Sequence, residues 1–273
     1  MAIKSDFHLH TSYSTDSDES MENVVLKAIE LGLKEICLTD HHDIDFPYDE
    51  NTPEGSFVLN TDAYLYDILK LRQKYQDQIN ILFGVEVGVQ PHLRRELAIY
   101  SKSYDFDFII ASTHVVDRKD PYFRDLFSEL SDAQLFDLYF HRVYEQLKMY
   151  SNFDVLGHLD YIVRYGYKKE EEYSYDKYKD IIDAILTQII EMEKGIELNT
   201  GAIRSGMKEL NPCADIVRRY RELGGEIITI GSDAHDVSRI ADGFDRAEQV
   251  LLDCGFKYYA TFEKRVATFH KLG

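Results

Sequence analysis

The sequence has few of the features that would place it in a membrane or outside the cell. Its apolar runs fall well short of the about 20 residues that a membrane-spanning helix needs, and its N-terminus lacks a signal-peptide pattern. Cysteine is scarce: Cys37, Cys213 and Cys254 are scattered and form no CxxC spacing. Such a set suits buried thiols in a reducing compartment rather than a disulfide framework. We therefore expect a cytoplasmic protein with no membrane partner.

Basic residues are also in deficit. The chain has 31 lysines and arginines against 49 acidic residues, which gives a formal net charge of −18. That charge repels nucleic acid over most of the surface, and no basic stripe interleaved with aromatic residues offsets it. A polynucleotide partner is therefore not expected.

Internal repeats, low-complexity tracts and linkers are absent as well. A chain of 273 residues is within the range of one barrel domain, so we expect a single domain over residues 1–273, with the oligomeric state left open. What recurs is a short β-branched strand followed by a helix, which implies parallel strands joined by right-handed crossovers. A barrel of about seven strands is the predicted architecture, and an open doubly wound sheet is the alternative. After a first strand that contains Ile3, Phe7 and Leu9, we predict strands at 34–40, 80–89, 105–114, 153–158, 195–199 and 226–230.

Residues of the metal-binding type stand at the carboxyl end of each predicted strand. In a parallel α/β barrel these ends meet on one rim, where active sites form. His8 and His10 are two apart on an extended segment, so they project to the same face. Seven of the ten histidines belong to this set, and Asp16 lies in a loop that could reach the same rim. The set is His8, His10, Asp40, His41, His42, Glu86, His114, His158, Asp160, Asn199, Asp233 and His235.

Histidine and carboxylate ligands without thiolates suit divalent ions such as Zn²⁺, Mn²⁺ or Fe²⁺. A catalytic site with one ion uses three protein ligands, so this many candidates indicate two or three ions bridged by a carboxylate. Such a cluster lowers the pKa of a bridging water and binds both oxygens of an in-line displacement, which is typical of phosphate-ester hydrolysis. The sequence thus predicts metal-dependent hydrolysis of a phosphate ester.

The motifs resemble one known superfamily along nearly the whole chain. HxH at 8–10, TDHH at 39–42, the lone Glu86, STH at 112–114, GHLD at 157–160 and SDAH at 232–235 are similar to those of the polymerase and histidinol phosphatase (PHP) superfamily. The length and the TDHH motif resemble its histidinol-phosphate phosphatases. The resemblance implies a distorted (β/α)₇ barrel, similar to a TIM barrel, with the metal site at the carboxyl-terminal rim. It further implies hydrolysis of L-histidinol phosphate to L-histidinol and phosphate, in histidine biosynthesis, by a metal-bridging hydroxide.

The same resemblance implies three ligand groups, the first two sharing Glu86 as a bridge. Zn²⁺ is the favoured ion, with Mn²⁺ or Fe²⁺ as alternatives. Many relatives place a histidine where this chain offers Asp16, and Asp18 is close enough to leave the register open. Asp6 and Asp40 are expected to orient imidazoles through their free N–H groups. The groups are His8, His10, Glu86 and Asp233; Glu86, His114 and His158; and His41, His235 and Asp16.

Some residues of this set are expected to act on the substrate. His42 is free of metal in this scheme and could bind the phosphate or protonate the leaving oxygen, so it is counted with Asp233 as catalytic. Arg164 and Arg204 follow the fifth and sixth predicted strands and are the predicted phosphate ligands, because guanidinium matches phosphate oxygens. The long loop after TDHH is expected to be a substrate lid whose acids hold the amine and imidazole. Those acids are Asp43, Asp45, Asp49, Glu50 and Glu54.

Other functions remain open at this point. A PHP nuclease or nucleotide phosphatase, or a protein tyrosine phosphatase, would share the metal ligands. The acidic balance disfavours polynucleotides but not mononucleotides. An inactive metal-binding regulatory module is the alternative from another class, and the intact ligand set argues against it. The expected partner is a small-molecule phosphate monoester.

Overall fold

Eight strands form one parallel sheet, seven of them hydrogen-bonded in the order β1-β2-β4-β5-β6-β7-β8, with the short β3 paired to β4. The computed structural model describes residues 3–49 and 52–273. Every pairing in this sheet is parallel, as the alternation of strands and helices predicts. The strands are β1 (Ser5–Asp6), β2 (Glu35–Leu38), β3 (His41–His42), β4 (Asn80–Gly88), β5 (Phe108–Ser112), β6 (Val155–Leu156), β7 (Gly195–Asn199) and β8 (Ile228–Gly231).

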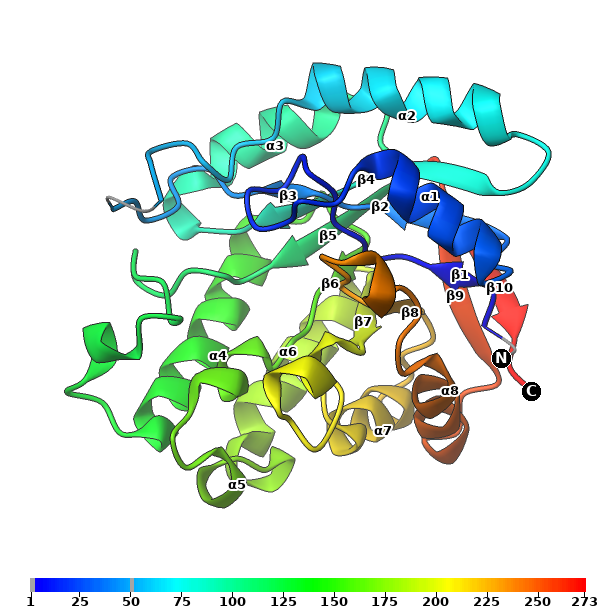
Figure 1. Ribbon diagram of the computed structural model, residues 1–273. Helices are drawn as coiled ribbons and strands as arrows, with labels where there is room; N and C mark the ends of the chain where they lie inside the picture. The colour runs from blue at the N-terminus through cyan, green and yellow to red at the C-terminus, as the bar shows by residue number, and fades with distance from the viewer. Residues whose placement is uncertain (1–2, 50–51) are drawn as a thin grey trace.

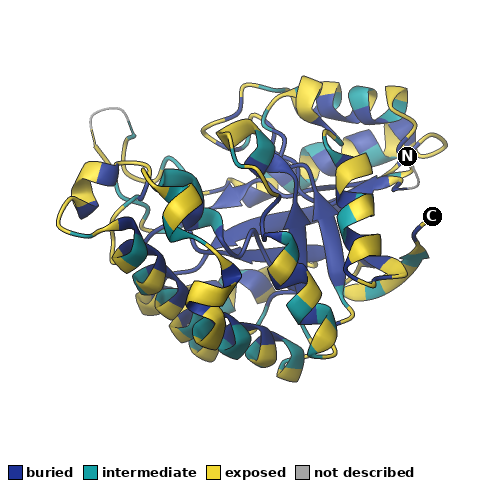
Figure 2. Ribbon diagram, turned by 90° about the horizontal axis from the view of Figure 1, so that it is seen from below, coloured by how far each residue is buried: buried dark blue, intermediate teal, exposed yellow. Residues whose placement is uncertain are grey.

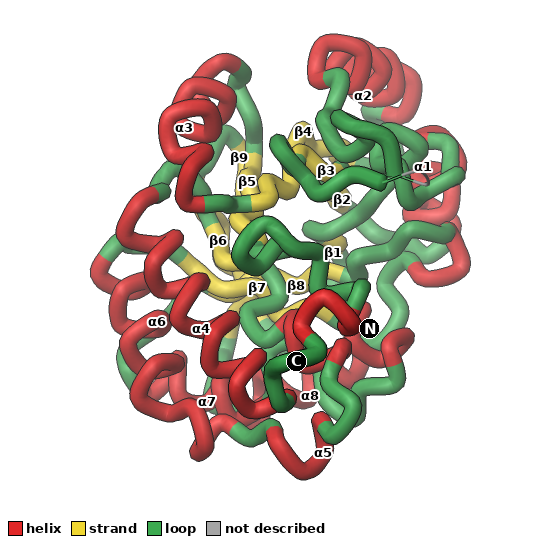
Figure 3. The backbone as a smooth tube through the Cα atoms, turned by 90° about the vertical axis from the view of Figure 1, so that its left-hand side faces the viewer, coloured by secondary structure: helices red, strands yellow, loops and turns green. Residues whose placement is uncertain are grey.

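The two ends of the sheet meet where β1 and β8 run side by side. The Phe7 N–H donates to the Ile230 carbonyl at 3.1 Å, and the Asp233 N–H donates to the His8 carbonyl at 2.8 Å. The sheet thereby curls into a nearly closed barrel, visible as a ring of strands inside the helices in Figure 3. The predicted distorted (β/α)₇ barrel is confirmed, and the alternative of an open doubly wound sheet is wrong.

Helices surround the barrel and turn their exposed faces outward (Figure 1, Figure 2). All but the short, charged α5 bury apolar residues; α6, for example, buries Ile182, Ile185, Leu186 and Ile189 at helical spacing. No helix in the described part of the chain is long and apolar enough to cross a membrane. The helices are α1 (Met21–Glu30), α2 (Thr61–Tyr75), α3 (Arg94–Ser103), α4 (Asp132–Met149), α5 (Lys169–Glu172), α6 (Lys179–Glu191), α7 (Ala214–Glu222) and α8 (Phe244–Asp253).

The C-terminal segment is an antiparallel hairpin of β9 (Tyr258–Glu263) and β10 (Val266–Lys271). Ala260 and Phe262 of β9 join an apolar cluster with Phe7, which follows β1, and with Phe108, the first residue of β5. At the hairpin turn, Arg265 Nε donates to the buried Asp154 at 2.5 Å. The hairpin therefore packs against the end of the barrel opposite the predicted rim and leaves that rim open.

Several predicted boundaries shift in the structure. Asn211-Pro212 has the pattern of an N-cap followed by a first helical residue, but α7 begins at Ala214, with Cys213 as its N-cap. Asn211 is used elsewhere, since its backbone pairs with Asn199 and its side chain donates to the buried Asp160 at 2.5 Å. Most strands are shorter than predicted, although β7 has its predicted bounds, so most of the predicted site residues lie just beyond the strands, on the connecting loops.

Candidate metal centre

The HxH segment lies just beyond β1, where the ends of β2 and β8 hold it in place. The Leu9 N–H donates to Thr39 Oγ1 at 3.0 Å, and the His8 carbonyl and His10 N–H bond to the chain after β8. Both histidines are fully buried, and their ring centroids are 5.1 Å apart. The two imidazoles thus face one volume, as their spacing predicts.

The first ligand group is His8, His10, Glu86 and Asp233. Glu86 Oε2 lies 3.3 Å from His8 Nε2 and 3.6 Å from His10 Nε2. Asp233 Oδ1 lies 3.8 Å from His8 Nε2 and 3.4 Å from His10 Nε2. Ligand atoms about 2.0–2.2 Å from a tetrahedral zinc ion are about 3.3–3.6 Å from one another. Three of these four distances lie in that range and the fourth, between His8 and Asp233, is 3.8 Å, so the group is close to the geometry that one such ion requires.

Glu86 reaches the second group with its other oxygen. Oε1 lies 3.2 Å from His114 Nε2 and 2.9 Å from His158 Nε2, and it accepts a hydrogen bond from Ser112 Oγ at 2.6 Å. His41 Nδ1 also lies 2.9 Å from Glu86 Oε2. One carboxylate, buried in the middle of β4, thus has neighbours from several ligand groups, which is the geometry of a bridge.

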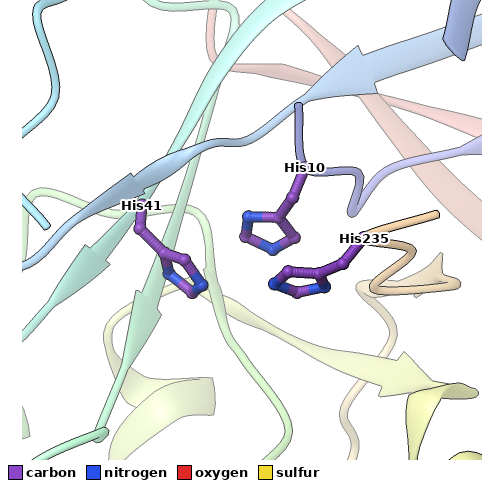
Figure 4. A group of neighbouring side chains, drawn as sticks. All are labelled: His10, His41 and His235. Carbon is purple, nitrogen blue, oxygen red and sulfur yellow. The ribbon is translucent and has the colours of Figure 1, made fainter. Parts of the chain in front are cut away.

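The third group gathers around Asp16. Its Oδ2 lies 3.5 Å from His41 Nε2 and 3.2 Å from His235 Nε2, so Asp16 rather than Asp18 is the carboxylate beside these histidines. Figure 4 shows His41, His10 and His235 turned toward one another from three different segments. The rings of His10 and His235 stack with centroids 4.1 Å apart. All nine side chains that the resemblance implies as ligands therefore converge on one centre.

The charges and unpaired atoms of this centre fit divalent ions. Burial opposes ionisation of Glu86, but the neighbouring His8, His114 and His41 hold the pKa of its carboxyl well below the usual range. Buried polar atoms without partners are costly, and a bound cation would satisfy them. Among the described residues, the unpartnered atoms include His8 Nε2, His10 Nε2, His41 Nδ1 and Glu86 Oε2. Nitrogen and oxygen donors without sulfur suit Zn²⁺, Mn²⁺ or Fe²⁺.

Two carboxylates that orient the histidines were not assigned this role from the sequence. Glu197 of β7 accepts from His8 Nδ1 at 2.6 Å, and Asp43 accepts from His114 Nδ1 at 2.8 Å. Such partners fix the tautomer and the ring orientation of a metal-binding histidine. The signal for Glu197 is a carboxylate in the middle of a short, fully buried strand, the same signal that singles out Glu86.

Asp6 and Asp40 do not contact imidazoles directly, which corrects the expectation for them. Asp6 accepts hydrogen bonds from the backbone and hydroxyl of Ser232 at 2.9 and 2.6 Å. Asp40 accepts from Ser14 Oγ at 2.7 Å, and that hydroxyl lies 3.0 Å from His10 Nδ1. Asp40 therefore supports His10 through a hydroxyl, while Asp6 holds the loop that follows β8.

A cavity of about 340 Å³ opens over the ligand groups, a volume typical of small-molecule sites. Metal-ligand candidates form its polar floor. Its walls are aromatic and come from loops after β3, β5 and β6. The aromatic lining residues are Phe46, Phe57, Tyr122, Tyr161 and Tyr165.

Of the two predicted phosphate-binding arginines, Arg164 lines this cavity. Its guanidinium lies over the Tyr161 ring at 4.3 Å, and its buried Nε and Nη2 have no hydrogen-bond partner among the described residues. Arg204 is placed differently: it donates to the carbonyls of Ser232, at 2.9 Å, and Asp233. Arg204 is thus engaged in holding the loop that carries a metal-ligand candidate, and it does not line the cavity.

His42 is also directed away from the cavity. Its ring stacks on Tyr100 with centroids 3.6 Å apart, and Nδ1 accepts from the Leu59 N–H at 3.3 Å. Burial lowers the pKa of His42 to about 4. Successive side chains of a strand point to opposite faces, so β3 directs His41 to the centre and His42 outward. This position does not support the predicted contact with phosphate or leaving group.

Comparisons with known proteins agree with this arrangement. The profile of the PHP domain matches residues 6–201. A protein of Clostridium acetobutylicum named "Probable histidinol-phosphatase" is 33% identical over 97% of this chain and 98% of its own length. The "Histidinol-phosphatase" of Lactococcus lactis is 30% identical over 95% of this chain and 94% of its own. A crystal structure of histidinol phosphate phosphatase from Lactococcus lactis, complexed with zinc, L-histidinol and phosphate, superposes with a TM-score of 0.89 at 29% identity, covering 97% and 98% of the two chains.

Proposed function

Because this chain belongs to the PHP-domain family, among its histidinol-phosphatases, we propose that it hydrolyses L-histidinol phosphate to L-histidinol and phosphate with the help of bound divalent metal ions. The resemblance of its motifs leads to the same assignment. The reaction is that of a phosphoric monoester hydrolase acting on a small molecule.

One observation carries the proposal. The three ligand groups adjoin Glu86 on the floor of a single cavity, which also holds an arginine with unpaired N–H groups. Metal ions held by clustered ligands would bind the attacking and leaving oxygens of an in-line displacement. A guanidinium group pairs with the remaining phosphate oxygens. This combination is the one that a phosphate monoester requires.

One set of residues would bind the metal ions, and another would bind the phosphate ester. Divalent ions held by the three groups would neutralise the phosphate oxygens and lower the pKa of the attacking water. Arg164 donates from Nε and Nη2 to phosphate, and its stacking on the Tyr161 ring holds the guanidinium in one orientation. Glu197 and Asp43 keep His8 and His114 oriented. Phe46, Phe57 and Tyr122 enclose the organic part of the substrate.

Turnover of competing esters tests the assignment. Purified protein is assayed with histidinol phosphate, a phosphotyrosine peptide and a mononucleotide, and kcat/KM is compared. We expect histidinol phosphate to exceed the others at least about 100-fold, because it alone offers the amine and imidazole of the expected substrate. A comparable or higher kcat/KM for the peptide or the nucleotide would instead assign the chain to one of the rival phosphatase functions.

Metal content is a separate part of the proposal. We propose three ions, with zinc as the native metal, because each ligand group offers at least three side chains. Elemental analysis of the protein purified without chelators should give between two and three ions per chain. A value of one or less contradicts the multinuclear centre whatever the substrate proves to be.

A further inference from the structure

We propose that Asp120 selects substrates with a cationic group, by pairing with a protonated nitrogen on the organic part of the phosphate ester. The inference deepens the proposed phosphatase function and rests on it. Asp120 lies on the loop after β5, on a different segment from the predicted lid, and lines the cavity.

The carboxylate of Asp120 is fixed in place yet has no cationic partner. Its Oδ1 accepts the backbone N–H of Tyr122 at 2.8 Å, in the turn that carries this aromatic side chain to the cavity wall. Within residues 3–49 and 52–273, no lysine, arginine or histidine nitrogen forms an ion pair with Asp120. Asp120 is half-buried, so a cation that enters the cavity would stabilise the negative charge of its carboxylate.

The other acids that line the cavity are already engaged. Asp16, Glu86 and Asp233 lie within 4.0 Å of histidine nitrogens in the metal centre. Asp43 bonds to His114 Nδ1 at 2.8 Å. Asp120 is therefore the one carboxylate among the described lining residues that remains for a substrate cation.

The lid acids predicted for this task do not fit it. Asp45 is paired with His92 Nε2 at 2.7 Å and lies 3.8 Å from Arg118 Nη1, outside the cavity. Asp49 and Glu54 do not line the cavity, and Glu50 lies outside the described residues. The structure thus moves the expected cation contact from the lid to the loop after β5.

The charges around Asp120 also favour the binding of a cation beside its carboxylate. Burial raises the pKa of its carboxyl, and the charges of Asp43 and Asp49 act in the same direction, against the Tyr122 N–H and His114. A protonated amine or imidazolium beside Asp120 would favour its ionised form. The ring of Tyr122 offers a face to the same cation.

Two matched esters isolate this contact. Ethanolamine phosphate and 2-hydroxyethyl phosphate have nearly the same size, and only the first carries an ammonium group. Both are assayed with the wild type, D120N and D120E, alongside histidinol phosphate. D125N is the control, because Asp125 is an exposed acid on the same loop that does not line the cavity.

We expect D120N to lose about 10- to 100-fold in kcat/KM for histidinol phosphate and ethanolamine phosphate, mostly through KM, as for a lost charge-assisted hydrogen bond. Its kcat/KM for 2-hydroxyethyl phosphate should stay within about threefold of the wild type, D120E should recover part of the preference, and D125N should match the wild type. Equal losses on both small esters, or no loss on the cationic ones, overturn the proposal. If the wild type favours ethanolamine phosphate through Asp120 but does not favour histidinol phosphate over the peptide and nucleotide, the proposed function fails while the cation contact stands.

Discussion

Replacing Glu197 by glutamine tests the role of a carboxylate that touches no proposed metal ion. Its Oε1 accepts from His8 Nδ1 at 2.6 Å, while Oε2 accepts from the His158 N–H at 3.0 Å and from Asn199 Nδ2 at 3.2 Å. In E197Q the amide oxygen can still face His8. The amide NH₂ must then take the place of Oε2, where it meets two donors.

The magnitude follows from these contacts. Losing the carboxylate partner of a metal-binding histidine costs about 10- to 100-fold in metal affinity, or about 1.4–2.7 kcal/mol. The two donors left facing an NH₂ group put E197Q at the upper end of that range. Leaving the buried His158 N–H unsatisfied also lowers the free energy of unfolding by about 1–3 kcal/mol.

The assay is competition for zinc against a chelator of known affinity, with thermal unfolding of the metal-free protein measured in parallel. Zinc should be lost from E197Q at chelator concentrations about 100-fold lower than from the wild type. The control is E35Q, which makes the same chemical change at the amino end of β2, where Glu35 hydrogen-bonds with Asn80 and Thr261, away from the ligand groups. E35Q should keep the wild-type zinc affinity.

Wild-type zinc affinity in a folded E197Q would refute the reasoning, because the negative charge beside His8 Nδ1 would then contribute nothing to metal binding. A loss shared equally by E35Q would show instead that the assay reports general stability.

Three further predictions follow from other contacts. E86Q removes a carboxylate charge shared by several ligand groups, so elemental analysis should show at least one ion fewer per chain and kcat should fall at least about 100-fold; an unchanged ion count would disprove the bridge. Burial raises the pKa of Asp183, but hydrogen bonds from Arg219, Lys179 and Tyr175 together lower it more, to a net value well below the usual range. These contacts therefore stabilise the fold fully at pH values above the carboxyl's ordinary pKa, and this stabilisation is lost progressively as pH falls from there toward the lowered pKa of the folded state. D183N should lower the Tm by about 2–6 °C at pH 7 and by less near pH 3. A Tm difference that does not depend on pH would contradict the charge argument. R265A leaves the buried Asp154 without its cation at the closed end of the barrel, and urea unfolding should show a loss of about 3 kcal/mol with the metal content unchanged; loss of metal would mean that the two ends of the barrel are coupled.

The convergence of the candidate ligands was predictable because strand topology alone brings these side chains together. In a closed parallel barrel every strand carries its last residues to one rim, so residues as distant in sequence as His8 and Asp233 must approach. A carboxylate such as Glu86 within an apolar strand is recognisable for the same reason, since burying it requires partners. These inferences need only the direction of the strands.

The substrate contacts were less predictable because they depend on which way a side chain turns. His42 and His41 are adjacent in β3, yet one stacks on Tyr100 and the other lies beside Glu86. Arg164 and Arg204 occupy similar loops, but only Arg164 lines the cavity, and its buried Nε and Nη2 have no hydrogen-bond partner among the described residues. Loop geometry and packing against neighbouring helices decide these orientations. Neither leaves a periodic pattern of residues from which the orientation could be predicted.

By itself, then, the sequence determined the barrel, the convergence of histidines and carboxylates on its rim, and the metal-dependent chemistry that they imply, because alternating strand and helix patterns dictate where strand ends lie. The tertiary structure decided which carboxylates bond to those histidines, where the unpaired arginine lies and which acid lines the cavity without an ion-pair partner among the described residues. Glu197 and Asp120 acquire their roles only from neighbours that are far away in the chain or on another loop. Distances between loops are set by packing, and packing exists only once the chain has folded.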